Sequence, residues 1–404
     1  MLDAQPTAVP KSSIAHELPI GFHRIHPDVS INYQLNRFSD GSPAMVEAMR
    51  KVAPKIFDYR DYTRELSALS REAYERGRLL EGALFLRSAQ FYMFPGDAAK
   101  EPARRQFVST MRSVYGVAEN AYHVVPYQTA SLFAYRFTPP SPRGTIVLAC
   151  GFDGYVEETF PMVMALRDAG YDVVAFEGPG QGSVLEDVHL AMTPEWDRPV
   201  AAVLDHFHLA GVTLLGMSLG GCLAVRAAAR EPRVTKVVCD DVLADFEAAI
   251  LQQVPGPKRL VLRGLLAARA SSLVNRMMAM AMRESLVIEW GIKQGMLVTG
   301  TPSPYDFLRE AMRYETASLS GLLTQDVLIM AGAEDHYVPS TQLVDQFRLL
   351  TKARSVTARL FTREEQAQNH IQLGNLGLSV DVIVRWLGGI EGRDRRMNRR
   401  PVSP

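Results

Sequence analysis

The sequence predicts an α/β fold: a doubly wound, mainly parallel sheet, with a helical segment before it and a helical cap inserted into it. The first observation is that short apolar runs alternate with helix-compatible stretches along most of the chain. Such runs, bounded by turn residues, are typical of buried strands. We expect strands near residues 145–150, 172–177, 211–216, 234–239, 326–331 and 355–361. Strands that alternate with helices form a parallel sheet covered on both faces.

The second observation is a change of period near residue 120. Before it, apolar residues recur at helical spacing, as in Leu66, Leu69 and Ala73, which indicates helices that pack by one face. After it, residues 122–125 and 132–137 have the pattern of two paired strands. We therefore expect the first part of the chain to be helical and separate from the sheet.

The third observation is a long gap between two strands, from Asp240 to Leu323. A stretch of this length must carry structure of its own, and it leaves the sheet at the carboxyl edge, where ligands bind in such folds. We expect a helical cap with methionines such as Met277 and Met280 on its inner face, although such methionines are more often plain core. The predicted regions are 1–120 (helical), 121–239 with 324–390 (core), 240–323 (cap) and 391–404 (disordered basic tail).

Composition excludes several classes of function. The 404 residues carry 44 basic and 44 acidic side chains, so no nucleic acid or anionic membrane is expected as a partner. No apolar stretch reaches membrane-spanning length, and no signal peptide is recognisable. The three cysteines, Cys150, Cys222 and Cys239, fall in or beside predicted buried elements. We expect a cytoplasmic protein without a metal or cofactor, and the sequence leaves open whether it forms a homodimer.

The candidate nucleophile is Ser218, in the run Gly216-Met217-Ser218-Leu219-Gly220. This run follows a predicted strand and precedes a predicted helix, which is the setting of a nucleophile elbow. The flanking glycines remove Cβ atoms that would clash in so tight a turn. The serine hydroxyl is thereby presented at the start of a helix.

The partners of Ser218 follow from chain order, because the acid and the histidine come after the serine in folds with such an elbow. His336 and His370 are the histidines beyond it. His336 is adjacent to the best acid candidate, Asp335, and is poorly placed to bond it, so we expect His370 to be the base. Asp241, which ends the strand after the elbow, is the alternative acid.

Two backbone amides are expected to stabilise a developing oxyanion, one from the residue after the nucleophile and one from the loop after an earlier strand. Leu219 supplies the first. The strand near residues 145–150 leads into Gly151-Phe152-Asp153-Gly154, where Phe152 is the preferred second donor and Asp153 the next.

The motif set as a whole resembles the α/β-hydrolase superfamily. The motifs are Gly151-Phe152-Asp153-Gly154-Tyr155, Phe176-Glu177-Gly178-Pro179-Gly180-Gln181-Gly182, the serine elbow, Ala333-Glu334-Asp335 and Asn369-His370. The helical segment before the sheet and the late insertion resemble a branch with 2,6-dihydroxypseudooxynicotine hydrolase, fungal heptaketide-shortening hydrolases and FrsA-like proteins. One departure is Cys150-Gly151, where the superfamily often has His-Gly. The resemblance implies hydrolysis beside a carbonyl, including cleavage of carbon–carbon bonds in β-diketone-like compounds.

The sequence therefore predicts a serine hydrolase that attacks a carbonyl of a compact, mainly apolar small molecule, through Ser218, His370 and Asp335. Two alternatives stay open at this point. The same residues could serve acyl transfer or cyclisation if the cap excludes water. A ligand-binding protein on a hydrolase scaffold is the third interpretation, because fold alone does not fix function.

Overall fold

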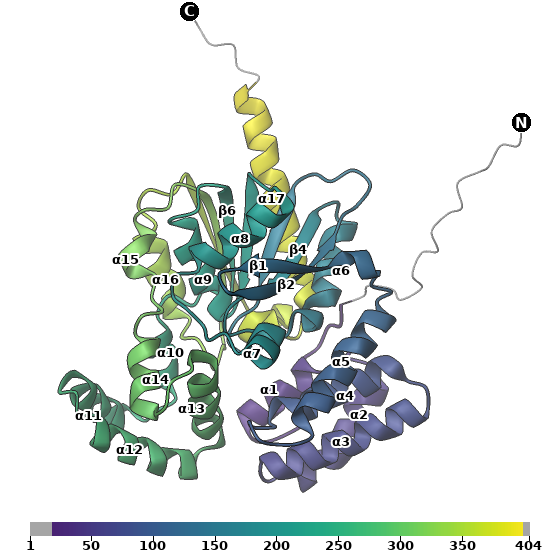
Figure 1. The fold of residues 1–404 in the computed structure, drawn as a ribbon, viewed down its shortest axis with the longest axis vertical. Coiled ribbons are helices and arrows are strands. Elements are labelled where there is room, and N and C mark those ends of the chain that lie inside the picture. The colour runs from purple at the N-terminus through teal and green to yellow at the C-terminus, as the bar shows by residue number, and fades with distance from the viewer. Residues whose placement is uncertain (1–17, 399–404) are drawn as a thin grey trace, which may run out of the picture.

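The computed structural model describes residues 18–398 and has a central sheet with helices on both faces (Figure 1). Two helical regions lie side by side at one end of the sheet, at the bottom of the view in Figure 1. One comes from the N-terminal part of the chain and the other from the late insertion. These two regions and the sheet edge between them position the candidate site.

The sheet has eight strands in the order β1-β2-β4-β3-β5-β6-β7-β8. The first two strands are antiparallel, and the six that follow are parallel to one another. This confirms the predicted fold class, and the six predicted strands lie within one residue of their expected bounds. The strands are β1 (Tyr122–Tyr127), β2 (Ala130–Phe137), β3 (Thr145–Ala149), β4 (Asp172–Glu177), β5 (Val212–Met217), β6 (Val234–Asp240), β7 (Asp326–Gly332) and β8 (Ser355–Phe361).

Helices cover the two faces of the sheet with separate apolar cores. Residues of α7, α8, α9 and α16 share one core with the strands, and residues of α6 and α17 share the other. Burying both faces explains why β4 and β7 are apolar along almost their whole length. The helices are α6 (Phe160–Asp168), α7 (Gly182–Val188), α8 (Asp197–Phe207), α9 (Leu219–Ala228), α16 (Thr341–Leu349) and α17 (Leu376–Asn398), with 3₁₀ turns at Val156–Thr159, Arg363–Glu365 and His370–Gln372.

The predicted disordered tail at 391–404 is wrong for its first half, because α17 continues to Asn398. Ion pairs hold this part of the helix to the sheet: Arg393 bonds Asp326 at 2.8 Å, and Glu391 bonds Arg143 at 3.0 Å. Arg393 and Glu391 therefore have oppositely charged partners that the sequence pattern alone does not reveal. Residues 399–404 lie outside the described part of the chain.

In the described part of the chain, the N-terminal region forms five helices, drawn in purple and dark blue in Figure 1, and their core also includes Trp290 of the insertion. We expected this region to be separate from the sheet, and that expectation is wrong. Ala83, Phe107 and Met111 belong to the core that lies beneath α6 and α17. Each apolar helix face thus has the sheet or another helix to bury it. The elements are α1 (Val29–Arg37), α2 (Pro43–Val52), α3 (Tyr59–Glu75), α4 (Leu79–Phe91) and α5 (Lys100–Val114), with 3₁₀ turns at Ala53–Lys55 and Glu119–Ala121. Residues 1–17 of the predicted segment are outside the described range.

The insertion between β6 and β7 is helical, as its composition predicts. At Gly295 an added Cβ would lie 2.1 Å from the Phe307 ring. The helices that carry these two residues therefore pack with the backbone of one against the ring of the other. Its outer arm is less buried, with Leu260 77% and Met280 52% exposed. The elements are α10 (Phe246–Gln252), α11 (Gly256–Ala267), α12 (Ser271–Glu284), α13 (Leu286–Thr299), α14 (Pro304–Ala311) and α15 (Ala317–Ser320).

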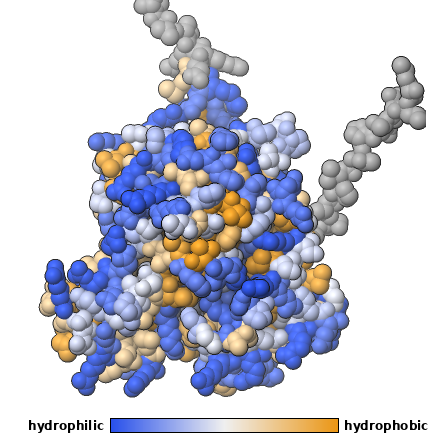
Figure 2. Space-filling model, viewed as in Figure 1, coloured by the Kyte–Doolittle hydropathy of each residue, from blue (hydrophilic) through white to orange (hydrophobic). Residues whose placement is uncertain are grey.

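The surface in Figure 2 is mostly hydrophilic, with scattered hydrophobic residues that include some on the α11–α12 arm at the lower left. Scattered apolar residues are normal on a folded protein. In the part of the chain that is described, no helix is both long enough and apolar enough to cross a membrane.

Candidate active site

Ser218 occupies a strained turn between β5 and α9. Its backbone has φ 58° and ψ −124°, a conformation that non-glycine residues avoid unless their surroundings impose it. The glycines around it explain how the turn fits. A Cβ on Gly216 would lie 1.9 Å from the Gly220 carbonyl oxygen, and a Cβ on Gly220 would lie 2.7 Å from that of Cys150. The strand-turn-helix setting that the sequence predicts is therefore present.

The structure brings Ser218, His370 and Asp335 together from three separate segments. His370 Nε2 lies 2.8 Å from Ser218 Oγ, and His370 Nδ1 lies 2.6 Å from Asp335 Oδ2. The second oxygen of Asp335 accepts hydrogen bonds from the backbone amides of Tyr337 and Val338 at 2.7 and 3.0 Å. His370 and Asp335 are both almost fully buried. This geometry holds the imidazole in one orientation between the hydroxyl and the carboxylate.

Asp241, the alternative acid, also touches His370, with its Oδ2 3.1 Å from Nδ1. That contact is longer than the one to Asp335, and both Asp241 oxygens have other partners. Oδ2 accepts from the Ile371 amide and Oδ1 from the Gln372 side chain, each at 2.6 Å. Asp241 thus anchors the turn that carries His370, whereas Asp335 is aimed at the imidazole itself.

The electrostatics of this group follow from burial and proximity. Burial raises the pKa of Asp241 to about 6. Burial would also raise the pKa of Asp335, but the adjacent imidazole outweighs it and lowers that pKa. For His370, burial favours the neutral form, yet the two carboxylates prevail and raise its pKa. Opposite charges at this distance stabilise an imidazolium once it forms.

Within the described residues, one group of potential metal ligands is close enough to hold an ion: the atoms of Asp241, Asp335 and His370 lie within 4.8 Å of one another. Those atoms already bond one another or nearby backbone, and His370 uses both ring nitrogens. We therefore interpret the group as a proton-transfer arrangement. His336, the other late histidine, stacks on Tyr337 with ring centroids 3.8 Å apart.

The loop at residues 151–154 lies directly against the elbow. A Cβ on Gly151 would be 2.9 Å from Ser218 Cβ and 3.0 Å from the Leu219 amide nitrogen, so only glycine allows this approach. Gln181 donates to the carbonyls of Cys150 and Gly151 at 2.5 and 3.1 Å, which fixes the start of the loop. Gln181 is a residue that sequence reasoning missed, although it stands in the quoted Gly178-to-Gly182 motif.

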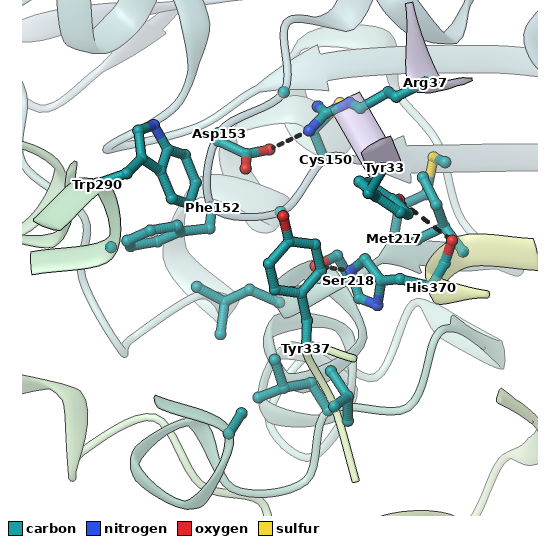
Figure 3. Close-up of a pocket in the computed structure, with 18 of the residues that line it drawn as sticks. Tyr33, Arg37, Cys150, Phe152, Asp153, Met217, Ser218, Trp290, Tyr337 and His370 are labelled. Atoms are coloured by element: carbon teal, nitrogen blue, oxygen red, sulfur yellow. Dashed lines mark hydrogen bonds and ion pairs between the residues drawn. The ribbon is translucent and has the colours of Figure 1, made fainter. Parts of the chain in front are cut away.

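The amides of Phe152 and Leu219 donate to no acceptor within the described chain. Leu219 directly follows Ser218, and the loop that carries Phe152 lies against the elbow, so both amides can serve as donors to an oxygen bound beside Ser218. Figure 3 shows the Phe152 and Asp153 side chains on one side of the cavity and the Ser218–His370 pair on another.

The Ser218 hydroxyl faces a cavity of about 220 Å³ with mainly apolar walls. Such a cavity suits a compact apolar molecule with a few polar groups. Both helical regions line it. The N-terminal helices contribute Tyr33, Arg37, Phe38 and Leu84, and the insertion contributes Phe246, Ile250, Met278, Trp290 and Phe307.

The N-terminal contribution is the largest omission of the sequence reasoning. Arg37 bonds Asp153 at 3.0 Å and Glu158 at 2.8 Å, and Arg87 bonds Glu158 at 2.6 Å. Arg87 also donates to the Asp153 carbonyl at 2.8 Å. Tyr33 donates to the carbonyl of His370 at 3.2 Å. No spacing in the sequence predicts these pairs, because the partners are more than sixty residues apart.

The inner face of the insertion differs in detail from our expectation. Met278 is buried and lines the cavity, whereas Met280 points to solvent and Met277 packs against neighbouring core residues. Consecutive residues of a helix are about 100° apart around its axis, so the methionine run could not by itself indicate which member faces inward. Met277 and Met280 are therefore both wrong as cavity residues.

Comparison with known proteins places this chain among relatives of the same architecture. The family described as alpha/beta hydrolase fold matches residues 144–360. A protein named hydrolyase poxO from Penicillium oxalicum is 28% identical over 359 residues, which cover 79% of this chain and 84% of that protein. An alpha/beta hydrolase named psoB, from Aspergillus fumigatus, is 26% identical, with 77% of this chain and 78% of its own length covered.

Two solved structures agree with this placement. The 2,6-dihydroxy-pseudo-oxynicotine hydrolase superposes with a TM-score of 0.60 at 18% identity, over 87% of this chain and 93% of that one. The structure of AbyA5 superposes with a TM-score of 0.63 at 18% identity, over 88% and 93%. At this identity the agreement concerns the fold alone. The resemblance stated from the motifs is confirmed.

Proposed function

The chain belongs to the alpha/beta hydrolase fold family, and from that premise we propose that it is a serine hydrolase with Ser218 as nucleophile, His370 as base and Asp335 as acid. The observation that carries the proposal is the continuous hydrogen-bonded row from Asp335 through His370 to Ser218 at the wall of an apolar cavity. A ligand-binding protein would have no need of that row.

In the first half-reaction, His370 Nε2 takes the proton of Ser218 Oγ as that oxygen attacks the substrate carbonyl. Negative charge moves to the carbonyl oxygen, which accepts hydrogen bonds from the amides of Phe152 and Leu219. Asp335 stabilises the imidazolium and keeps Nδ1 protonated. Collapse of the intermediate breaks the bond to the leaving group, and His370 returns the proton to it.

In the second half-reaction, a water molecule takes the place of the leaving group. His370 removes one of its protons, the hydroxide adds to the acyl carbon, and Ser218 leaves with the proton held by the imidazole. For an ester, the products are an alcohol and an acid. For a β-diketone-like substrate the broken bond is carbon–carbon, and the leaving carbanion is stabilised by its neighbouring carbonyl.

The cavity supports a compact, mainly apolar substrate. The charged groups beside it, Arg37, Asp153, Glu158 and Arg87, pair with one another. Shape and apolar contact should therefore contribute more to selection than net charge does. The motif resemblance to the branch described above favours hydrolysis of a carbon–carbon bond beside a carbonyl. Ester hydrolysis is the alternative.

The test is covalent labelling. A fluorophosphonate probe should add to Ser218 of the wild-type protein, as seen by intact mass and peptide mapping, and should not add to Ser218→Ala. An absent adduct on the folded wild type, or an equal adduct on the variant, would contradict the proposal. Mass spectrometry of products from a panel of esters and β-diketones then separates hydrolysis from acyl transfer.

A further inference from the structure

Beside the Ser218–His370 pair, the cavity holds a polar position that the proposed mechanism does not use. It consists of the Tyr337 hydroxyl and the Asp153 carboxylate, which both line the cavity. In Figure 3 the Asp153 carboxylate, which lies beside Phe152 and Trp290, and the Tyr337 hydroxyl point into the same space. Most other residues around them are apolar, so these two groups stand out as the places where a substrate oxygen could be held.

Tyr337 is arranged as a hydrogen-bond donor. Its oxygen accepts from the Gln34 side-chain amide at 3.1 Å. The nearest other partner, Ser30 Oγ, is 3.5 Å away, at the limit of hydrogen bonding. Burial raises the pKa of Tyr337 to about 12, so the phenol keeps its proton at neutral pH. That proton is therefore available to a group in the cavity.

Asp153 is arranged as an acceptor. Its Oδ1 bonds Arg37 at 3.0 Å, and within the described residues no donor bonds its Oδ2. Its side chain is 22% exposed, whereas the neighbouring Arg37 and Glu158 side chains are 13% and 12% exposed. Arg37 and Arg87 balance Asp153 and Glu158 in charge, so this position has no net charge with which to select an ion.

A neutral group that both donates and accepts fits this pair, and a hydroxyl is the simplest such group. The position is next to the reacting centre, because Asp153 follows Phe152 in the chain and the Tyr337 ring packs edge-on against His370 with centroids 5.3 Å apart. A substrate whose carbonyl is attacked by Ser218 would therefore have its neighbouring carbons in the cavity that these two groups line.

We propose that Tyr337 and Asp153 form a specificity-determining subsite for a neutral alcoholic hydroxyl on the carbon β to the attacked carbonyl. The substrate class is thereby a β-hydroxy carbonyl compound with an apolar remainder. This inference rests on the proposed function, since it takes the attacked carbonyl to lie at Ser218.

The experiment compares two para-nitrophenyl esters, of β-hydroxyhexanoic acid and of hexanoic acid, by kcat/KM. The wild type should prefer the hydroxy ester by about 10- to 100-fold, the usual value of one or two hydrogen bonds in a partly buried site. Tyr337→Phe keeps the ring against His370 and should lose most of that preference. Gln34→Met, which removes only the neighbour that orients the phenol, should lose a smaller part of it.

Tyr74→Phe is the matched control, because it removes a phenol that bonds Thr110 in the N-terminal helices, away from the cavity. It should keep the wild-type ratio. A wild type without preference, or a Tyr337→Phe variant that is slowed equally on both esters, would overturn the subsite and reduce Tyr337 to packing. Fluorophosphonate labelling of Ser218 in every variant reports on the nucleophile separately, so loss of the subsite is distinguishable from failure of the proposed function.

Discussion

The two helical regions that cover the catalytic edge hold the same loop by different means. The N-terminal helices hold Asp153 by charge, with Arg37 on its carboxylate and Arg87 on its carbonyl. The insertion holds the preceding residue, Phe152, by ring contacts. Its partners are Phe246, Trp290 and Phe307, with ring centroids 5.3, 6.0 and 6.4 Å away. Consecutive residues of one loop are thus fixed from opposite sides.

The difference indicates a division of labour. Charge-assisted hydrogen bonds are directional and fix the backbone on which an oxyanion donor depends. Apolar contacts have no preferred direction and adapt to the shape of what they enclose. We expect the N-terminal helices to govern the rate of the chemical step and the insertion to govern the choice of substrate. The regions also touch each other, through the stacked rings of Phe91 and Trp290 at 4.8 Å.

The largest loss of activity is expected when the acid, Asp335, is removed, and it gives a scale for the effects of changes in both helical regions. Asp335→Asn should reduce kcat by about 10³- to 10⁴-fold, since the imidazole loses the carboxylate that orients it and stabilises its charge. Steady-state kinetics on a hydrolysed ester would measure the effect, with thermal melting to show that the variant is folded.

Asp241→Asn is the matched control for that change. It should cost far less, because Asp241 anchors the turn of His370 while Asp335 still contacts the ring. Asp241 helps to raise the pKa of His370, so its loss should let the imidazole become neutral at a lower pH. The acid limb of the kcat/KM profile should therefore move to lower pH. An equal loss of activity in both variants would mean that the acid is wrongly assigned.

The second effect tests the charged side of the comparison. Arg37→Gln should lower kcat by about 10²-fold with a much smaller change in KM, because a displaced 151–154 loop weakens one oxyanion donor. Rates of Ser218 labelling by a fluorophosphonate should fall in parallel. Arg76→Gln, which removes an exposed ion pair with Glu72 on the same region, is the control and should be nearly silent. An effect confined to KM would assign Arg37 to substrate binding. It would contradict the expectation that the N-terminal helices govern the rate of the chemical step.

The smallest effect tests the apolar side. Met278→Ala should change the preference between short and long acyl chains by about tenfold, since a few methylene groups of cavity wall are removed. Ser218 labelling by a small probe should change less. Met280→Ala, on the same helix but 52% exposed, should leave the preference alone. If the two variants behave alike, or if Met278→Ala only lowers the melting temperature, Met278 contributes to stability and the insertion does not set the choice of substrate.

The sheet, the elbow and the acid and base candidates could all be predicted from local patterns in the sequence. Those features depend on local pattern: apolar runs set the strands, and glycine spacing set the turn at Ser218. Chain order then left His370, which lies within 2.8 Å of the serine in the structure. Asp335 was the preferred acid and Asp241 the alternative, and the structure places both carboxylates beside the imidazole of His370.

The groups that surround Ser218, His370 and Asp335 could be identified only from the tertiary structure. The pairs Arg37–Asp153 and Arg87–Glu158 join helices to a loop across 116 and 71 residues, and the Tyr337–Gln34 contact spans 303. Such contacts depend on how helix faces pack against the sheet, and a local pattern does not encode a partner at that separation. The same reason explains Met278 and the helical end of α17: a periodic run predicts a helix, but only its neighbours decide which face is buried and which charges are paired.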